Sequence, residues 1–296
     1  MKKLVAAILS VLMIAALTAC SDNTDNNGGY DDYRQDETVK TYEKIGDDTF
    51  HFESVDSVSV RITNFESTDD APHAVTIPAY LDGKQVVGIA EEAFRYKSNI
   101  STVIFPTAED YQEGDADFSA AEFSFTIAKY AFRDCAVLST VTLPDYVTEI
   151  GTGIFYGCAK LESVTFADNC RIASIPSYSF MECPALKTIV LPASVLSVGE
   201  AAFFECASLE SVTVEEAAEG STQLILAKAF MNCKNLSSVT LPASVISVGK
   251  YAFHGSEKLY TDGFHYAGTS EEVQEYIKGL MLTDSPAESE TETTGN

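Results

Sequence analysis

The feature that most constrains this chain is a unit of about 23–27 residues that recurs along it. The phrase LPASVLSVGEAAF (191–203) returns at 241–253 as LPASVISVGKYAF, with three changes. A unit this short cannot build its own core, so it buries its apolar side chains by stacking on the next copy. We therefore expect a solenoid of about seven turns. The phenylalanines that mark the copies are Phe94, Phe132, Phe155, Phe180, Phe203, Phe230 and Phe253, at spacings of 38, 23, 25, 23, 27 and 23.

Each copy also contains a short extended run in which apolar and polar residues alternate. In the run around Val141-Thr142-Leu143, the valine and leucine face one side of a strand and Thr142 the other. Stacked turns then carry a β-branched, mostly hydroxyl ladder on the outer face of a mainly β stack. Gly199 and Gly249 are interpreted as relieving a tight bend. The outward positions that match Thr142 are Thr165, Val190, Thr213 and Thr240.

The repeats resemble the BspA-like branch of the leucine-rich repeats, whose units read approximately LxxVxLPxxVxxIGxxAFxxC. The clearest copies are LSTVTLPDYVTEIGTGIFYGC (138–158) and LKTIVLPASVLSVGEAAFFEC (186–206). The resemblance covers 75–277 and implies a leucine-rich-repeat solenoid, placed at 75–261, with adhesion-type roles. The chain departs from the pattern where Pro176 replaces the glycine of the unit and where 106–126 inserts an acidic loop.

The two ends of a solenoid need caps, because an open sheet edge invites pairing with another chain. At the N-terminal end, 42–74 is expected to form a β cap, since 48–65 has the alternation of strands. At the C-terminal end, 262–282 is expected to form a short helical cap. Thr269 and Glu272 have the spacing of a capping box at the start of that helix. The apolar side of the helix carries Val273, Tyr276, Ile277 and Leu280.

The first twenty residues have the features of a secretory signal. A basic start is followed by the apolar run LVAAILSVLMIAAL, and then by Leu17-Thr18-Ala19-Cys20, which resembles the bacterial lipobox. The resemblance implies a signal peptide at 1–19, lipidation of Cys20 and anchoring to a bacterial membrane. An ordinary signal peptide with a chance cysteine is the alternative. The polar composition predicts a disordered tether over 20–41 and a disordered acidic tail over 283–296.

The strong negative charge excludes some partners. Asp and Glu number 44 against 19 Lys and Arg, a formal charge of −25. Such a surface opposes binding to nucleic acid, whose phosphates need basic contacts, and opposes adhesion to anionic lipid by charge alone. The charge is interpreted either as a solubility feature or as the mark of a partner of complementary charge.

Five cysteines also follow the repeat, each three residues after its phenylalanine. They lack the paired spacing of zinc ligands and the CxxC of redox motifs. We interpret them as free, buried thiols at a corner of each turn. Disulfides between neighbouring turns are the alternative, but an odd number and a stacked register do not guarantee their geometry. The five are Cys135, Cys158, Cys183, Cys206 and Cys233.

Catalytic motifs are absent from the sequence. It contains no GxSxG, HExxH, Walker-type or dinucleotide-binding pattern, and its four histidines share no motif. A hydrolase that uses surface carboxylates is a remote alternative. The sequence therefore predicts a non-enzymatic protein with no catalytic residue, metal or cofactor.

The insertion is the first candidate binding segment, because insertions in one turn of a solenoid often lie on its binding face. Tyr111 and Phe118 are aromatic anchors of the kind that interfaces favour, although Phe118 and Phe123 can instead pack onto the stack. Asp115 and Asp117 belong to an acidic cluster that is either solvated or bound to calcium. The outward hydroxyl ladder of Thr142, Thr165, Thr213 and Thr240 is the second candidate.

These features together predict a non-enzymatic cell-surface binding or adhesion protein. Its leucine-rich-repeat face would meet a host, matrix or other surface protein, or less readily a glycan, because the chain has no Trp. The folded part is expected to be monomeric and attached to the membrane by the N-terminal lipid. A structural lipoprotein that organises other envelope proteins is the alternative function.

Overall fold

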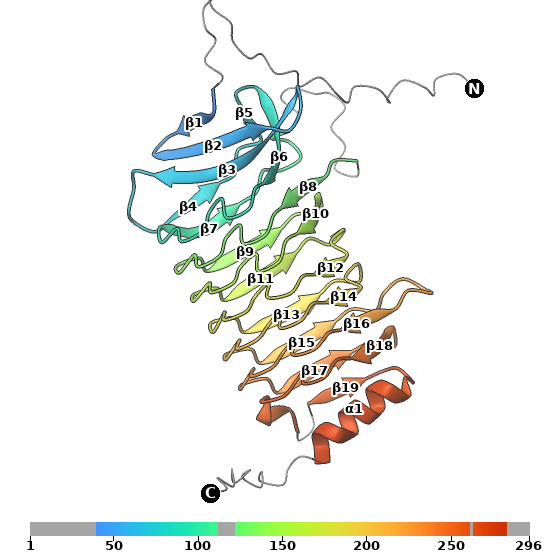
Figure 1. Cartoon of the computed structure of the whole chain (residues 1–296). Helices are drawn as coiled ribbons and strands as arrows, with labels where there is room; N and C mark the ends of the chain where they lie inside the picture. Colours follow the sequence, from blue (N-terminus) through green and yellow to red (C-terminus); the bar gives the residue numbers. More distant parts are fainter. Residues whose placement is uncertain (1–39, 112–121, 261–262, 283–296) are drawn as a thin grey trace, which may run out of the picture. The chain divides into compact units, whose positions relative to one another are not determined.

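The described residues, 40–111, 122–260 and 263–282 of a computed structural model, form stacked turns that each place one strand in each of two columns (Figure 1). The predicted mainly β solenoid is confirmed. The predicted signal peptide, nearly all of the tether and the acidic tail lie outside the described residues.

The first column holds two four-stranded sheets that face the same side of the stack. Their strands pair in parallel within each sheet. One sheet contains β4 (His73–Thr76), β7 (Ile100–Ile104), β9 (Thr140–Leu143) and β11 (Ser163–Phe166). The other contains β13 (Thr188–Leu191), β15 (Ser211–Val214), β17 (Ser238–Leu241) and β19 (Phe264–Tyr266).

The second column is built in the same way and begins in the N-terminal cap. There β1 (Tyr42–Ile45), β2 (Asp48–Ser54) and β3 (Ser59–Ser67) are antiparallel neighbours, and β3 then pairs in parallel with β6 (Lys84–Ile89). A short β5 (Tyr80–Leu81) lies antiparallel to β6. The column continues through β8 (Phe125–Ile127) and β10 (Val147–Ile150), and then through β12 (Ser174–Ile175), β14 (Ser197–Val198), β16 (Gln223–Ile225) and β18 (Val245–Val248).

A column of stacked phenylalanine rings runs along the core. Successive rings from Phe94 to Phe253 lie 4.9–5.6 Å apart between centroids and within 24° of parallel. Phe65, at the end of β3, stacks on Phe94 at 5.2 Å and donates its N–H to Ala93 O at 3.1 Å. The column therefore has eight rings where the sequence predicted seven, because the cap contributes one.

The turns around these rings form a third ladder of hydrogen bonds. In one turn, the N–H groups of Tyr130, Phe132 and Asp134 donate to carbonyls of the next turn at 2.7–3.0 Å. Tyr130 and Asp134 both have φ of +57°, a left-handed conformation that costs a non-glycine residue roughly 1–2 kcal/mol. Equivalent positions, two residues before and after the phenylalanine, repeat this conformation along the stack. This left-handed conformation was not predicted from the sequence.

The strand ladders are interrupted beside the turn that carries β11 and β12. The first column breaks between β11 and β13, and the second breaks between β10 and β12. A proline stands at one donor position beside each break, and each proline lacks the N–H that would donate to the preceding turn. Pro176 occupies the position at which Gly151 and Gly199 donate to Ile127 O and Ile175 O, both at 2.7 Å. Pro192 occupies the position at which Glu215 donates to Leu191 O.

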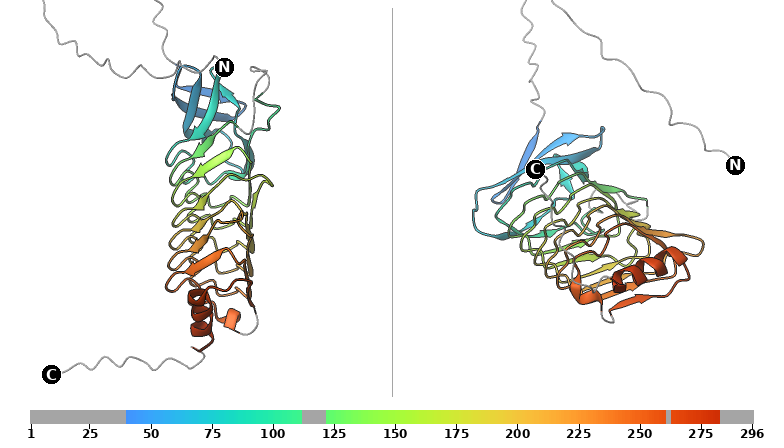
Figure 2. Two further views of the ribbon diagram at one scale, coloured as in Figure 1. Left: turned by 90° about the vertical axis from the view of Figure 1, so that its right-hand side faces the viewer. Right: turned by 60° about the horizontal axis from the view of Figure 1, so that its bottom comes forward.

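The C-terminal cap is the helix α1 (Glu271–Leu282), which packs against β18 (Figure 2). Val273 is fully buried, and the Tyr276 hydroxyl accepts the N–H of Phe253 at 3.0 Å. The expected packing over the last turn is confirmed for Val273, Tyr276 and Ile277, and the side chain of Leu280 lies outside the described part of the helix. The capping-box expectation is wrong, because Ser270 Oγ accepts the Val273 N–H while Glu272 accepts a hydrogen bond from Ser247.

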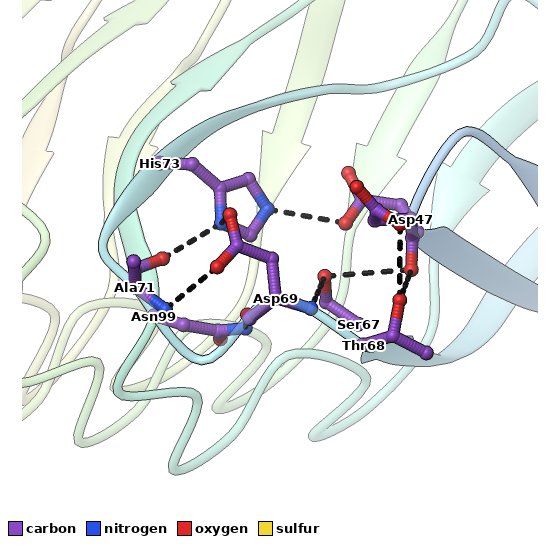
Figure 3. A network of polar contacts seen from close by, with 8 residues as sticks. Asp47, Ser67, Thr68, Asp69, Ala71, His73 and Asn99 are labelled. Atoms are coloured by element: carbon purple, nitrogen blue, oxygen red, sulfur yellow. Dashed lines mark hydrogen bonds and ion pairs between the residues drawn. The ribbon is translucent and has the colours of Figure 1, made fainter.

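A polar network ties the N-terminal cap to the first turn of the solenoid (Figure 3). His73 Nε2 lies 3.1 Å from Asp48 Oδ1, and Nδ1 lies 3.0 Å from Ala71 O. Both partners are acceptors, so the imidazolium, with two N–H donors, satisfies both contacts. The Ala71 carbonyl, and then the Asp48 carboxylate, raise the pKa of His73 above its usual value.

The His73 network predicts a pH-dependent cap. Because the folded-state pKa of His73 is raised, its stabilisation is complete below the unfolded-state pKa and is lost as pH rises through the folded-state pKa. From pH 5.5 to 8.5 the native protein should therefore lose up to about 1 kcal/mol of unfolding free energy relative to His73→Gln. Urea unfolding of both proteins at the two pH values measures this difference. A difference that does not change with pH would contradict the role given to His73.

The glycines that follow strands of the second column lie close to the backbone of the preceding turn. Gly199 and Gly249, which were expected at a tight bend, do not have a left-handed φ, and their position is instead close to that backbone. A Cβ on Gly199 would lie 2.4 Å from the backbone N of Ser177 in the preceding turn. Gly199→Ala should therefore lower the unfolding free energy by about 1–3 kcal/mol, measured by urea unfolding. Gly279→Ala in α1 is the matched control, because its Cβ meets nothing within 4 Å and alanine favours a helix.

Candidate binding surface

The outward side of the first column carries two rows of small hydroxyl side chains, which we call the hydroxyl face. Parallel pairing sets Thr142 opposite Thr165, and Thr213 opposite Thr240, with strands about 4.8 Å apart. Thr142, Thr165 and Thr240 are exposed and Thr213 is half-buried, so the sequence placed all four on the correct side. The second row consists of Thr140, Ser163, Thr188, Ser211 and Ser238.

Two hollows lie on the hydroxyl face. One, of about 420 Å³, spans β7 and β9 and is lined by Thr102, Ile104, Thr140 and Thr142, among others. The other, of about 330 Å³, lies at the interruption between β11 and β13. The regular rows alone would make a flat surface, so the hollows are where a partner's side chains can enter. The second hollow is lined by Ser163, Val164, Thr165, Phe166, Ala167, Asp168, Thr188, Val190, Pro192 and Glu215.

The hollow at the sheet interruption was not predicted from the sequence. Its outermost apolar residue, Val190, is 51% exposed and replaces the threonine of neighbouring turns. The departure Pro176 was the available signal, whereas Pro192 is the proline of the repeat pattern itself. Neither marks a hollow alone, because proline at the Pro192 position also occurs in turns whose strands stay paired.

The insertion differs from the expected binding loop. Tyr111 is fully buried, its hydroxyl donates to Val86 O at 3.3 Å, and burial raises its pKa. Its ring lies 4.8 Å from that of Phe123, which packs partly buried against the core. The prediction that Tyr111 is an exposed anchor is therefore wrong, because its ring fills space inside the stack. The candidates Asp115, Asp117 and Phe118 lie outside the described residues.

The ladder cysteines are buried, as expected, and each thiol donates to the carbonyl of the phenylalanine in the preceding turn. For Cys206 the acceptor is Phe180 O at 3.1 Å, and Ser256 makes the same contact with Phe230 O at 3.4 Å. Burial is the main cause that raises the pKa of Cys206 to about 12. These thiols therefore act as packed hydrogen-bond donors and have little nucleophilic character.

The outer face of the second column differs from the hydroxyl face because it exposes aliphatic side chains. Four aliphatic side chains there are 36–42% exposed, over β14, β16 and β18 and their flanks. In the N-terminal half of that column the corresponding surface is polar, as at Thr126 and Ser174. The four aliphatic residues are Leu196, Leu224, Leu226 and Ile246.

Within the parts of the chain that the structure describes, no cluster of three or more His, Cys, Asp or Glu side chains is arranged to hold a metal ion. In the same residues, no helix is both long and apolar enough to cross a membrane.

Comparisons with known proteins agree with this geometry. A family model described as the BspA type leucine rich repeat region matches residues 117–220 and 223–270 in six copies. The crystal structure of the T. pallidum leucine rich repeat protein TpLRR is similar with a TM-score of 0.58 and 25% identity, over 78% of this chain and 92% of that one. The pneumococcal vaccine antigen PcpA gives 0.47 and 19%, over 76% and 69%. No curated protein matches the sequence.

The stacked parallel strands and the repeated phenylalanine column define a leucine-rich-repeat protein. Because the family model matches more than half of the chain, the protein belongs to the BspA type leucine rich repeat family. Its relatives are repeat proteins of bacteria.

Thiol labelling tests the description of the cysteine ladder. In residues 21–296 at pH 8, Cys206 should react with a maleimide at least about a hundredfold more slowly than an exposed thiol, because it is buried and protonated. Mass spectrometry of the labelled peptides gives the rate. A cysteine introduced by Thr142→Cys on the hydroxyl face is the exposed control. Equal rates in the folded protein would contradict the description.

Proposed function

We propose that this chain is a non-enzymatic, surface-exposed binding protein that presents its hydroxyl face to a protein ligand. The observation that carries the proposal is that both hollows open on this face, between rows of exposed hydroxyl groups held in register. Such a face offers many weak hydrogen-bonding groups at fixed spacing. A rigid array of this kind suits an extended partner, because little side-chain entropy is lost on binding.

A protein ligand is favoured over a glycan. Sugar rings are often held against exposed aromatic side chains, and the chain has no Trp. The outward positions of β9, β11, β13, β15 and β17 are Thr, Ser and Val. Hydroxyls and short aliphatic groups match a polypeptide, which supplies both main-chain donors and side chains.

The location proposed for this protein is the outside of a bacterial membrane. The sequence Leu17-Thr18-Ala19-Cys20 supports lipidation of Cys20, and the polar residues 21–39 supply a tether between the lipid and the repeats. A host, matrix or other surface protein would then meet the hydroxyl face. Globomycin, which blocks lipoprotein signal cleavage, and labelling with a fatty-acid analogue test the anchor separately from the binding function.

A binding screen tests the proposed function. Residues 21–296 should give at least one saturable interaction with arrayed matrix, host-cell or bacterial surface proteins. Thr165→Lys should weaken it at least tenfold, because a positive charge at the centre of the hydroxyl face would be desolvated by the partner. The matched control is Ser174→Lys, which adds the same charge to an exposed position of the second column.

Other outcomes of that screen are also decisive. A ligand that is unaffected by Thr165→Lys but lost in Leu224→Lys would move the site to the aliphatic residues of the second column. If the array is silent, the hydroxyl-face proposal fails. Crosslinking in the native cell would then test the alternative, a lipoprotein that organises other envelope proteins.

A further inference from the structure

The hollow between β11 and β13 combines three features, of which the other hollow shares the exposed aliphatic residue, as Ile104. It lies where the strand ladder is interrupted, so β11, which pairs with β9 on one side, is not paired in a sheet with its other neighbour β13. It has an exposed aliphatic residue, Val190, in a row of threonines. It also has two ionisable side chains in its lining, Asp168 and Glu215, and both are acidic.

The two carboxylates reach the hollow from different turns. Asp168 follows β11, while Glu215 follows β15 and extends back so that its Oε2 accepts the N–H of Ala193 at 3.1 Å. This hydrogen bond holds Glu215 beside the loop after β13. Both carboxylates therefore border one hollow whose other walls are hydroxyl and aliphatic groups.

Acceptors dominate this lining. Carboxylates accept hydrogen bonds, and the hydroxyls of Ser163, Thr165 and Thr188 can each accept as well as donate. Lys187, which precedes the lining residue Thr188, is paired with Glu162 at 2.8 Å and does not line the hollow. This lining therefore complements a ligand that has several N–H donors and a positive charge.

We propose that this hollow binds an arginine or lysine side chain of the protein partner. The aliphatic stem would lie against Val190 and Pro192, and the charged head would contact the carboxylates of Asp168 and Glu215. The volume of about 330 Å³ lies at the lower end of the range of small-ligand pockets, about 300–1,000 Å³, as one long side chain requires.

The inference rests on the proposed function and specifies its partner. A basic segment is attracted to a chain with a formal charge of −25, but that attraction is general and falls with salt. The hollow adds a position at which one cationic side chain is recognised by shape. The partner of the hydroxyl face therefore has at least one exposed arginine or lysine at the centre of its contact surface.

The test uses a small probe that isolates this contact. Nα-acetyl-L-argininamide is titrated into isotope-labelled residues 21–296 and followed by amide chemical shifts, beside the lysine analogue and the uncharged, isosteric citrulline analogue. Saturable shifts should be confined to the amides around Thr165, Val190 and Ala193, and the citrulline analogue should bind at least tenfold more weakly.

Matched variants separate the hollow from general charge attraction. Asp168→Asn/Glu215→Gln should weaken the arginine probe at least tenfold. Glu210→Gln/Glu219→Gln, which removes two exposed carboxylates outside the lining, should leave its affinity unchanged. Equal losses in both double variants, shifts spread over the whole surface, or equal binding of citrulline would each overturn the inference.

Failure of the cationic site can be distinguished from failure of the proposed protein-binding function. If a screened ligand binds the hydroxyl face but keeps its affinity in Asp168→Asn/Glu215→Gln, the proposed function stands and the cationic site fails. If the probe occupies the hollow while the protein array stays silent, the site stands and the protein-binding function fails.

Discussion

The structure depends on the stacking of one phenylalanine per turn. The rings lie about one strand spacing apart and nearly parallel, so each turn must adopt the height and orientation of its neighbours. The surrounding contacts follow from this position. The thiol of Cys206 reaches the carbonyl of Phe180, and the N–H of Phe203 donates to Ala229 O at 2.7 Å. A cysteine fits there because it is small and donates a hydrogen bond without filling the space of the next ring.

This column explains how the solenoid tolerates interrupted sheets. Around the turn that carries β11 and β12, neither strand column is continuous, yet Phe155, Phe180 and Phe203 remain stacked at 5.5 and 4.9 Å. The turn ladder also continues, since Phe155 N–H donates to Ser179 O at 2.8 Å. At each of the two junctions around this turn one strand pairing is therefore lost, β10 with β12 at the first and β11 with β13 at the second. The other strand pairing and the phenylalanine stack maintain the connection between turns. The hydroxyl face has a hollow at this point, while the phenylalanine core beneath it remains continuous.

Periodic features were predictable from the sequence, and features of contact between turns were not. The phenylalanine spacing predicted the solenoid, and alternation in runs such as 140–143 placed Thr142 outward. Alternation of apolar and polar residues does not reveal backbone conformation, so the left-handed φ of Tyr130 and Asp134 was missed. The matching positions of the next turn are Gly153 and Gly157, and these glycines are a signal for a left-handed φ. Tyr111 was misjudged because an insertion has no repeat partner from which its burial can be inferred.

Identical repeats help the turns to stack, but binding of a partner at one place requires turns that differ from one another. A perfect array of threonines gives every turn the same surface, so it cannot position a partner along the stack. Position is defined where the repeat departs from its own rule, and Val190, Asp168 and Glu215 gather at such a departure. Because the phenylalanine column bears the structural constraint, these outward positions are free to vary without disturbing the core. Specificity in this protein should therefore reside in its irregular turns, such as the one at the interruption between β11 and β13.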